Sequence, residues 1–218
     1  MNDTDKRLLN ELSDSETQKA DAYNIRKNGK SIDRKTNPFV QIIPKEGNQG
    51  IDIYVKENTL LSVVHIPVIL TESGLTDVVY NDFHIGKNAN VIILAGCGVH
   101  NDEHKDTEHD GIHRFYLEEN AKVKYIEKHY GEGLGKGKKI LNPVTEIYMK
   151  NGSNMTMDTT QIKGVDTTER KTIGILESNA TLVINEKILT EGHQNAKTIF
   201  QVDLNGENAS THVTSRSV

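Results

Sequence analysis

Cysteine, tryptophan and long apolar runs are scarce or missing in this chain of 218 residues, and each shortage excludes a class of protein. The single cysteine, Cys97, excludes an intrachain disulfide and any zinc site made from several thiolates. No window approaches the run of about 18 apolar residues that spans a bilayer. The polar start MNDTDKRLLN also lacks the apolar core of a signal peptide. We therefore expect a soluble protein of the cytoplasm.

The chain also has few large aromatic side chains and no excess of positive charge. The chain has no Trp and four Phe, so a narrow core of Val, Ile and Leu is favoured over a wide sandwich. The formal charge is −5, and acidic and basic residues are interspersed along the chain. Because nucleic-acid binding needs a continuous cationic surface that releases counterions, we expect no nucleic-acid partner.

The first 45 residues predict a short helical segment followed by a linker, before a core domain over residues 46–218. Residues 4–27 contain no Gly or Pro and carry apolar side chains at roughly helical spacing, which predicts one or two helices. Pro38 and Pro44 then force extended backbone at the residues that precede them. The helical lead is expected to end near residue 30.

From residue 51 onward, short β-branched runs alternate with polar turns, and one pattern recurs five times. The segments are 83–94, 115–126, 147–158, 173–185 and 202–213, and their small turn residues are Ala89, Ala121, Ser153, Ala180 and Ala209. The steps between these turns are 32, 32, 27 and 29 residues. A near-constant period of this length is typical of stacked coils, so the sequence predicts an all-β solenoid. A meander of similar hairpins in a sandwich is the alternative.

Alternation along the second repeat separates an inner from an outer face. Lys122, Lys124 and Lys128 fall on one face, and Val123, Tyr125, Glu127 and His129 fall on the other. The apolar members of the second set predict that it faces inward. Glu127 and His129 are therefore expected to be sheltered from solvent.

The same register predicts a stack that contains the only thiol. His65, Cys97, His129 and Gln161 are spaced by 32 residues, and neighbouring strands lie about 4.8 Å apart. Cys97 and His129 could then share a metal, or the imidazole could lower the pKa of the thiol. His113 has the inward parity of Phe115 and Leu117. We thus predict a metal site formed by Cys97, His113, His129 and Glu127. The alternative is that Cys97 is a small buried apolar residue and His129 a hydrogen-bonded core histidine.

Other candidate chemistry is weaker. Residues 100–110 form an insertion-like loop that holds His100, His104 and His109 among five carboxylates, but its spacing matches no defined calcium or zinc loop. The glycine-rich run 131–137 lacks the Gly-Lys-Ser/Thr ending of a phosphate-binding loop. No Gly-x-Ser-x-Gly elbow is present. A carbohydrate-active β-helix enzyme would need aromatic sugar platforms and a signal peptide, and the sequence has neither in evidence.

Four segments resemble the SufB/SufD family of the SUF iron-sulfur cluster assembly system. They are HIPVILTESG (65–74), VVYNDFHIGKNANVIILAGCGV (78–99), HDGIHRFYLEENAKVKYIEKHYGEG (109–133) and THVTSRSV (211–218). The resemblance covers residues 51–218. It implies a right-handed parallel β-helix and association with SufC, an ABC-type ATPase. It also implies a role in building or transferring iron-sulfur clusters.

The chain departs from the family pattern at the Ser-Arg-Ser-Val motif, where it stops. Members of the family continue into further coils and a helical segment that hold their best-supported Cys, His and Glu positions, so none of these residues can be transferred. We expect either a natural short form that associates with itself, for example as a homodimer, or a missing C-terminal piece.

The sequence thus supports a non-enzymatic scaffold subunit that binds iron or an iron-sulfur cluster transiently, together with a SufC-like ATPase and a SufB/SufD-like subunit. The alternative is a metal-free β-solenoid that serves as a structural or interaction module.

Overall fold

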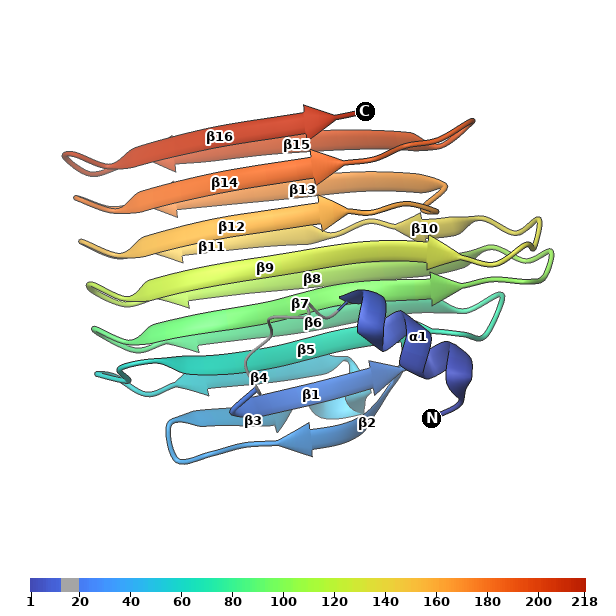
Figure 1. Ribbon diagram of the computed structural model, residues 1–218. Helices are drawn as coiled ribbons and strands as arrows, with labels where there is room; N and C mark the ends of the chain where they lie inside the picture. The colour runs from blue at the N-terminus through green and yellow to red at the C-terminus, as the bar shows by residue number, and fades with distance from the viewer. Residues whose placement is uncertain (13–19) are drawn as a thin grey trace.

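The computed structural model describes residues 1–12 and 20–218, and there the chain winds into stacked coils between two facing sheets (Figure 1). The stacked coils confirm the predicted all-β solenoid with a short N-terminal helix. The strands of neighbouring coils pair in parallel, as a solenoid requires. The two antiparallel pairs, β1 with β2 and β3 with β4, lie in the first coils.

The sheet order follows the coil order. In space, the first sheet runs through β16 (Ser210–Ser217), β14 (Thr181–Ile188), β12 (Asn154–Gln161), β9 (Lys122–Glu132), β7 (Asn90–His100), β5 (Ser62–Leu70), β1 (Ala22–Lys27) and β2 (Lys30–Lys35). The second runs through β10 (Lys139–Leu141), β13 (Thr167–Leu176), β11 (Val144–Met149), β8 (Thr107–Leu117), β6 (Thr76–Ile85), β4 (Gly50–Val55) and β3 (Val40–Pro44), and β15 (Asn195–Leu204) pairs with β13. A 3-10 turn, Glu46–Asn48, precedes β4.

The prediction of one or two helices over residues 4–27 is confirmed in part, and its portion over residues 13–19 lies outside the described residues. The helix α1 spans Asp3–Leu12 and lies on the outer side of the first sheet, where Leu8 and Leu12 pack with Ile69 and Tyr130 (Figure 1). Helix is wrong for Ala22–Lys27, which forms β1. This segment alternates buried and half-buried residues and pairs in parallel with β5, and such tertiary pairing outweighs a weak helical pattern.

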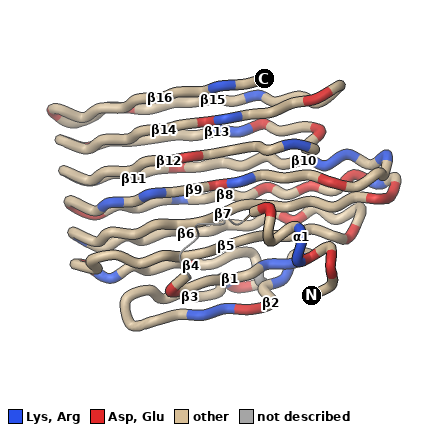
Figure 2. Tube along the Cα trace, viewed as in Figure 1, with Lys and Arg blue, Asp and Glu red and all other residues tan. Residues whose placement is uncertain are grey.

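The predicted linker is also largely strand. In addition to β1, the strands β2 and β3 lie within the first 45 residues. Strand β3 extends the second sheet beside β4. The described residues contain no helix long and apolar enough to cross a membrane. Acidic and basic residues both occur on many of the coils and in the turns at their ends (Figure 2).

The turns between the sheets share a backbone conformation that the repeat pattern did not predict. The small residue of each turn follows an asparagine or glycine with positive φ: Asn88, Asn120, Gly152, Asn179 and Asn208. Asn88 donates to the side-chain oxygen of Asn58 at 3.0 Å, and Asn120 donates to that of Asn88 at 3.3 Å. Asparagine tolerates this left-handed backbone, so the ladder links successive turns at little backbone cost.

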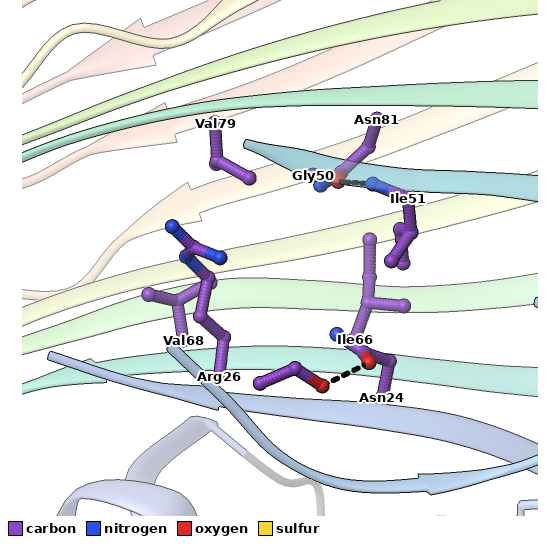
Figure 3. Close-up of a pocket in the computed structure, with 9 residues that line it drawn as sticks. Asn24, Arg26, Gly50, Ile51, Ile66, Val68, Val79 and Asn81 are labelled. Carbon is purple, nitrogen blue, oxygen red and sulfur yellow. Dashed lines mark hydrogen bonds between the residues drawn. The ribbon is translucent and has the colours of Figure 1, made fainter. Parts of the chain in front are cut away.

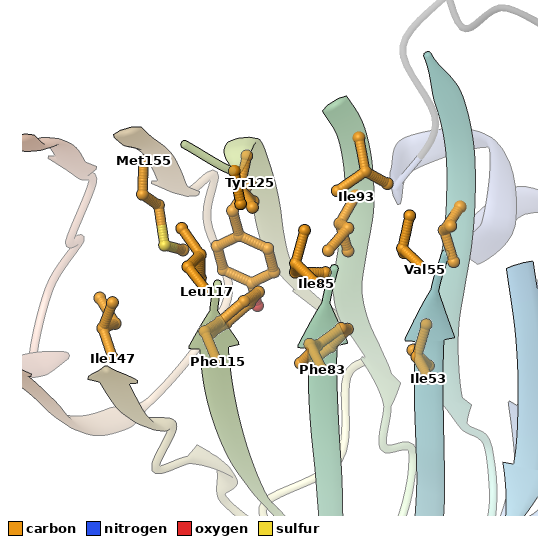
Figure 4. Close-up of a cluster of buried hydrophobic side chains, with 14 of the residues drawn as sticks. Ile53, Val55, Phe83, Ile85, Ile93, Phe115, Leu117, Tyr125, Ile147 and Met155 are labelled. Atoms are coloured by element: carbon orange, nitrogen blue, oxygen red, sulfur yellow. The ribbon is translucent and has the colours of Figure 1, made fainter. Parts of the chain in front are cut away.

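Rows of equivalent apolar side chains fill the interior (Figure 4). Ile53, Phe83, Phe115 and Ile147 occupy one register on four neighbouring strands. The rings of Phe83 and Phe115 stack with centroids 4.3 Å apart. Removal of these rows from water, at about 25 cal/mol per Å² of apolar area, drives the coils together.

The predicted register holds over most of the stack and is wrong in the first coil. Cys97 pairs with His129, and His129 pairs with Gln161, as expected. The partner of Cys97 on β5 is Val68, whereas His65 pairs with Leu94. The step from β5 to β7 is thus shorter than the 32 residues expected, and His65 belongs to a different row from the thiol.

Candidate functional site

A water-sized cavity of about 10 Å³ lies inside the solenoid, and all four residues predicted as metal ligands line it. Cys97 comes from β7, His113 from β8, and Glu127 and His129 from β9. Each has an exposed fraction of 7% or less. Parity along each strand turns these side chains inward, so the structure brings all four predicted residues to one cavity. His109 from β8 lines the same cavity and was not in the predicted set.

A directional chain of hydrogen bonds fixes the tautomer of His113. The Ile51 N–H donates to Asn81 Oδ1 at 3.2 Å, so the amide nitrogen of Asn81 faces His113 Nε2, 3.3 Å away. Nε2 therefore accepts, and Nδ1 carries the proton that it donates to the Tyr125 oxygen at 2.7 Å. The Tyr125 hydroxyl in turn donates to Glu127 Oε1 at 2.8 Å.

Arg170 of β13 supplies the charge that holds Glu127 in the interior. Its guanidinium donates to Glu127 Oε2 at 2.5 Å and to His129 Nδ1 at 3.1 Å. A second carboxylate, Glu186, lies 3.2 Å from its Nε. Arg170 is 3% exposed, and sequence reasoning missed it. The available signal was its inward parity within the polar run TTERKT, where the periodic pattern requires a buried residue.

The ionisation of the cluster follows from its burial. Burial lowers the pKa of His113 to about 4 and also lowers the pKa of His129, so both imidazoles are neutral at pH 7. Burial opposes the charge on Glu127, but the neighbouring His129 and the Arg170 guanidinium hold its pKa well below the usual value. Burial, with the charges of Asp77 and Glu127, raises the pKa of the Cys97 thiol. The expectation that His129 lowers the pKa of this thiol is therefore wrong.

Protein donors already occupy the acceptor nitrogens of two predicted ligands, His113 and His129, and one lone pair on each oxygen of Glu127. Asn81 faces the acceptor nitrogen of His113, and Arg170 covers that of His129. Both oxygens of Glu127 accept hydrogen bonds. Within residues 1–12 and 20–218, no group of three or more His, Cys, Asp or Glu side chains is arranged to hold a metal ion. Metal binding by Cys97, His113, His129 and Glu127 stays a prediction, and it would require the hydrogen bonds at the acceptor nitrogens of His113 and His129 to break.

A second buried ion cluster adjoins the cavity. Arg26 donates to both oxygens of Asp77, at 3.0 and 2.7 Å, and His109 Nδ1 lies 3.2 Å from Asp77 Oδ2. All three residues are 6% exposed or less. Arg26 and Asn81 also line a neighbouring cavity of about 10 Å³ (Figure 3). The polar interior thus extends from β1 to β14.

The histidines of residues 100–110 do not converge. The loop is shorter than expected, because β8 begins at Thr107 and places His109 inside the solenoid. His100 Nδ1 lies 3.1 Å from Glu132, and its Nε2 lies 2.9 Å from Asp102. The interior position of His109 and the opposite directions of the His100 contacts argue against one metal site in this segment.

A comparison with known families finds a match over the C-terminal half of the chain. The model described as "SUF system FeS cluster assembly, SufBD core domain" matches residues 105–218, which include the coils from β8 to β16. No curated protein and no solved structure matches the chain.

Proposed function

The chain belongs to the SufBD core-domain family of the SUF iron-sulfur cluster assembly system, and from this membership we propose that it is a non-catalytic scaffold subunit that supports cluster building or transfer. The observation that carries the proposal is the family match over more than half of the chain, on coils whose strand register is continuous. A rigid stack of coils suits a scaffold, because it holds interior side chains at fixed positions.

The proposed partners are a SufC-like ABC ATPase and a SufB/SufD-like subunit, the latter either a homologue or a second copy of this chain. The proposed place of action is the cytoplasm. Family membership supports the partnership, and the mixed surface charge fits a protein partner better than nucleic acid.

The proposed cargo is iron or an iron-sulfur cluster, held transiently. The only thiol of the chain lies among imidazoles in the cavity, and thiolate and imidazole are the ligands that iron-sulfur centres use. The alternative function, a metal-free structural module, is favoured by the hydrogen bonds that already occupy Glu127, His113 and His129.

Co-expression tests the scaffold function. The tagged chain is produced with the SufC-like ATPase of the same genome and purified, with an unrelated ABC ATPase as the control. We expect the SufC-like protein to copurify at a fixed stoichiometry and the unrelated ATPase not to. Failure of the SufC-like protein to copurify would contradict the partnership.

Anaerobic reconstitution tests the cargo. The purified protein is incubated with ferrous iron and sulfide, and visible absorption and bound iron are compared for wild type, Cys97→Ala and His129→Ala. A chromophore that Cys97→Ala abolishes supports a cluster at the cavity. If wild type binds no more iron than the variants, the metal-free module is the better description.

A further inference from the structure

Two atoms at the cavity that could bind a metal, Cys97 Sγ and His109 Nε2, have no hydrogen bond to any described residue. The thiol of Cys97 is 1% exposed and lines the cavity. His109 is 6% exposed and uses Nδ1 toward Asp77, which leaves Nε2 without a partner in the part of the chain that the structure describes. The two other imidazoles at the cavity use their acceptor nitrogens for Asn81 and Arg170.

Asp77 holds His109 in the orientation that a ligand requires. Arg26 donates one hydrogen bond to each oxygen of Asp77, which fixes the carboxylate in its ionised form. Its Oδ2 also accepts from His109 Nδ1 at 3.2 Å. With the proton on Nδ1 held by Asp77, Nε2 is the ring nitrogen whose lone pair can bind a metal. A carboxylate that orients a histidine in this way is the usual outer-shell arrangement of metal-bound imidazoles.

A glycine, Gly111, leaves space beside His109 Nε2 because it has no side chain. Gly111 lies between His109 and His113 on β8, and a Cβ built there would be 3.4 Å from His109 Nε2 and 3.3 Å from His113 Nε2. The cavity of about 10 Å³ that Gly111 lines has room for one atom of the size of a water oxygen. A single ion therefore fits, and a cluster does not fit without rearrangement.

We propose that Cys97 Sγ and His109 Nε2 bind one soft, thiophilic metal ion in this cavity, with Asp77 as the outer-shell carboxylate. A site with one thiolate and one imidazole suits Cu(I), which accepts few ligands and prefers soft ones. Binding replaces the thiol proton, which is released to solvent, by the metal. The inference rests on the proposed function only for the idea that the cavity receives a thiophilic cargo, and it assigns the ligands differently from the sequence prediction.

An anaerobic Cu(I) titration against a chromophoric chelator tests the assignment. The key variant is His109→Asn, whose amide nitrogen can still donate to Asp77 while the ligand atom is lost. The matched control is His129→Asn, whose amide oxygen can still accept from Arg170. We expect wild type and His129→Asn to bind one Cu(I) with affinities within about threefold, and His109→Asn and Cys97→Ser to lose at least tenfold.

Two further variants separate ligation from folding. Asp77→Asn keeps both ligands but removes the outer-shell charge, and a 10- to 100-fold weaker affinity is expected. Gly111→Ala fills the space and is expected to prevent binding. Circular dichroism and thermal melting of each variant identify any that fails to fold, and metal-dependent protection of Cys97 from alkylation gives a second readout.

Retention of wild-type affinity by a folded His109→Asn, or its loss in His129→Asn, overturns the assignment. Failure to bind Cu(I) in wild type does the same. None of these outcomes alters copurification with the ATPase, so failure of this inference and failure of the proposed function are distinguishable.

Discussion

His113 Nδ1 lies 2.7 Å from the phenol oxygen of Tyr125, and this hydrogen bond joins the two sheets inside the core. His113 is on β8 of one sheet and Tyr125 on β9 of the other. The same hydroxyl donates a hydrogen bond to Glu127, so the Tyr125 oxygen is a partner for two buried groups, the His113 N–H and the Glu127 carboxylate. The polar cluster therefore contributes to the structure of the solenoid as well as to the candidate site.

Substitution of Tyr125 by Phe tests this structural role. The change leaves the His113 N–H and one oxygen of Glu127 without their partner, and we expect a loss of about 2–4 kcal/mol in the free energy of unfolding. Tyr148→Phe is the control, because Tyr148 is 39% exposed and its loss of a hydroxyl should cost less than about 0.5 kcal/mol. Urea denaturation measures both, and equal effects would refute the role of the Tyr125 hydroxyl.

The depressed pKa of His113 predicts a pH dependence of stability. Its pKa is about 4 in the folded protein and 6.5 ordinarily, so between these values the unfolded chain binds a proton that the folded chain does not. Stability therefore rises with pH across this window and falls as pH decreases through it. The contribution of His113 between pH 7 and pH 5 is about 2 kcal/mol.

The variant His113→Gln isolates that contribution. It cannot titrate in this range, so its stability should change less between pH 7 and pH 5 than that of wild type, with the remainder due to other groups such as His129. Chemical denaturation at both pH values gives the difference. Parallel stability curves for wild type and variant would contradict the shifted pKa.

Leu8 is expected to attach α1 to the solenoid. Its side chain is fully buried, and a Cβ at Gly98 would lie 3.2 Å from the Leu8 Cβ, so the helix packs closely over a strand that has no side chain at this point. Leu8→Ala should cost about 2–4 kcal/mol of docking energy and speed hydrogen exchange in Asp3–Leu12, while exchange in β7 and β9 stays slow. Lys6→Ala, at a side chain that is 66% exposed, is the control. Unchanged exchange in the helix would show that other contacts hold it.

The asparagine ladder predicts an unusual order of substitution effects. Asn120 has φ of 57°, a conformation that costs an alanine about 1–2 kcal/mol and a glycine little. Asn120→Gly should thus be more stable than Asn120→Ala by about 1 kcal/mol, although both lose the hydrogen bond to Asn88. Thermal melting measures the order, with Lys122→Ala as an exposed neighbouring control. The reverse order would exclude backbone strain as the cause.

Much of the candidate cluster could be predicted because strands alternate and coils repeat. The interval of 32 residues placed Cys97 beside His129, and parity turned Glu127 and His113 inward. His65 was misplaced because the first coil is shorter, and a repeat pattern has no means of locating a change in coil length where the turn motif is weak.

The sequence by itself determined the solenoid, because each apolar face can be buried only by the next coil and the turn residues set where each coil closes. The tertiary structure alone decided which buried groups pair. Arg170 reaches Glu127 over 43 residues of chain, and Asp77 receives both Arg26 and His109. A buried charge takes whatever partner the facing sheet brings within hydrogen-bond distance, and that distance depends on the relative position of two sheets, which no periodicity within one strand contains.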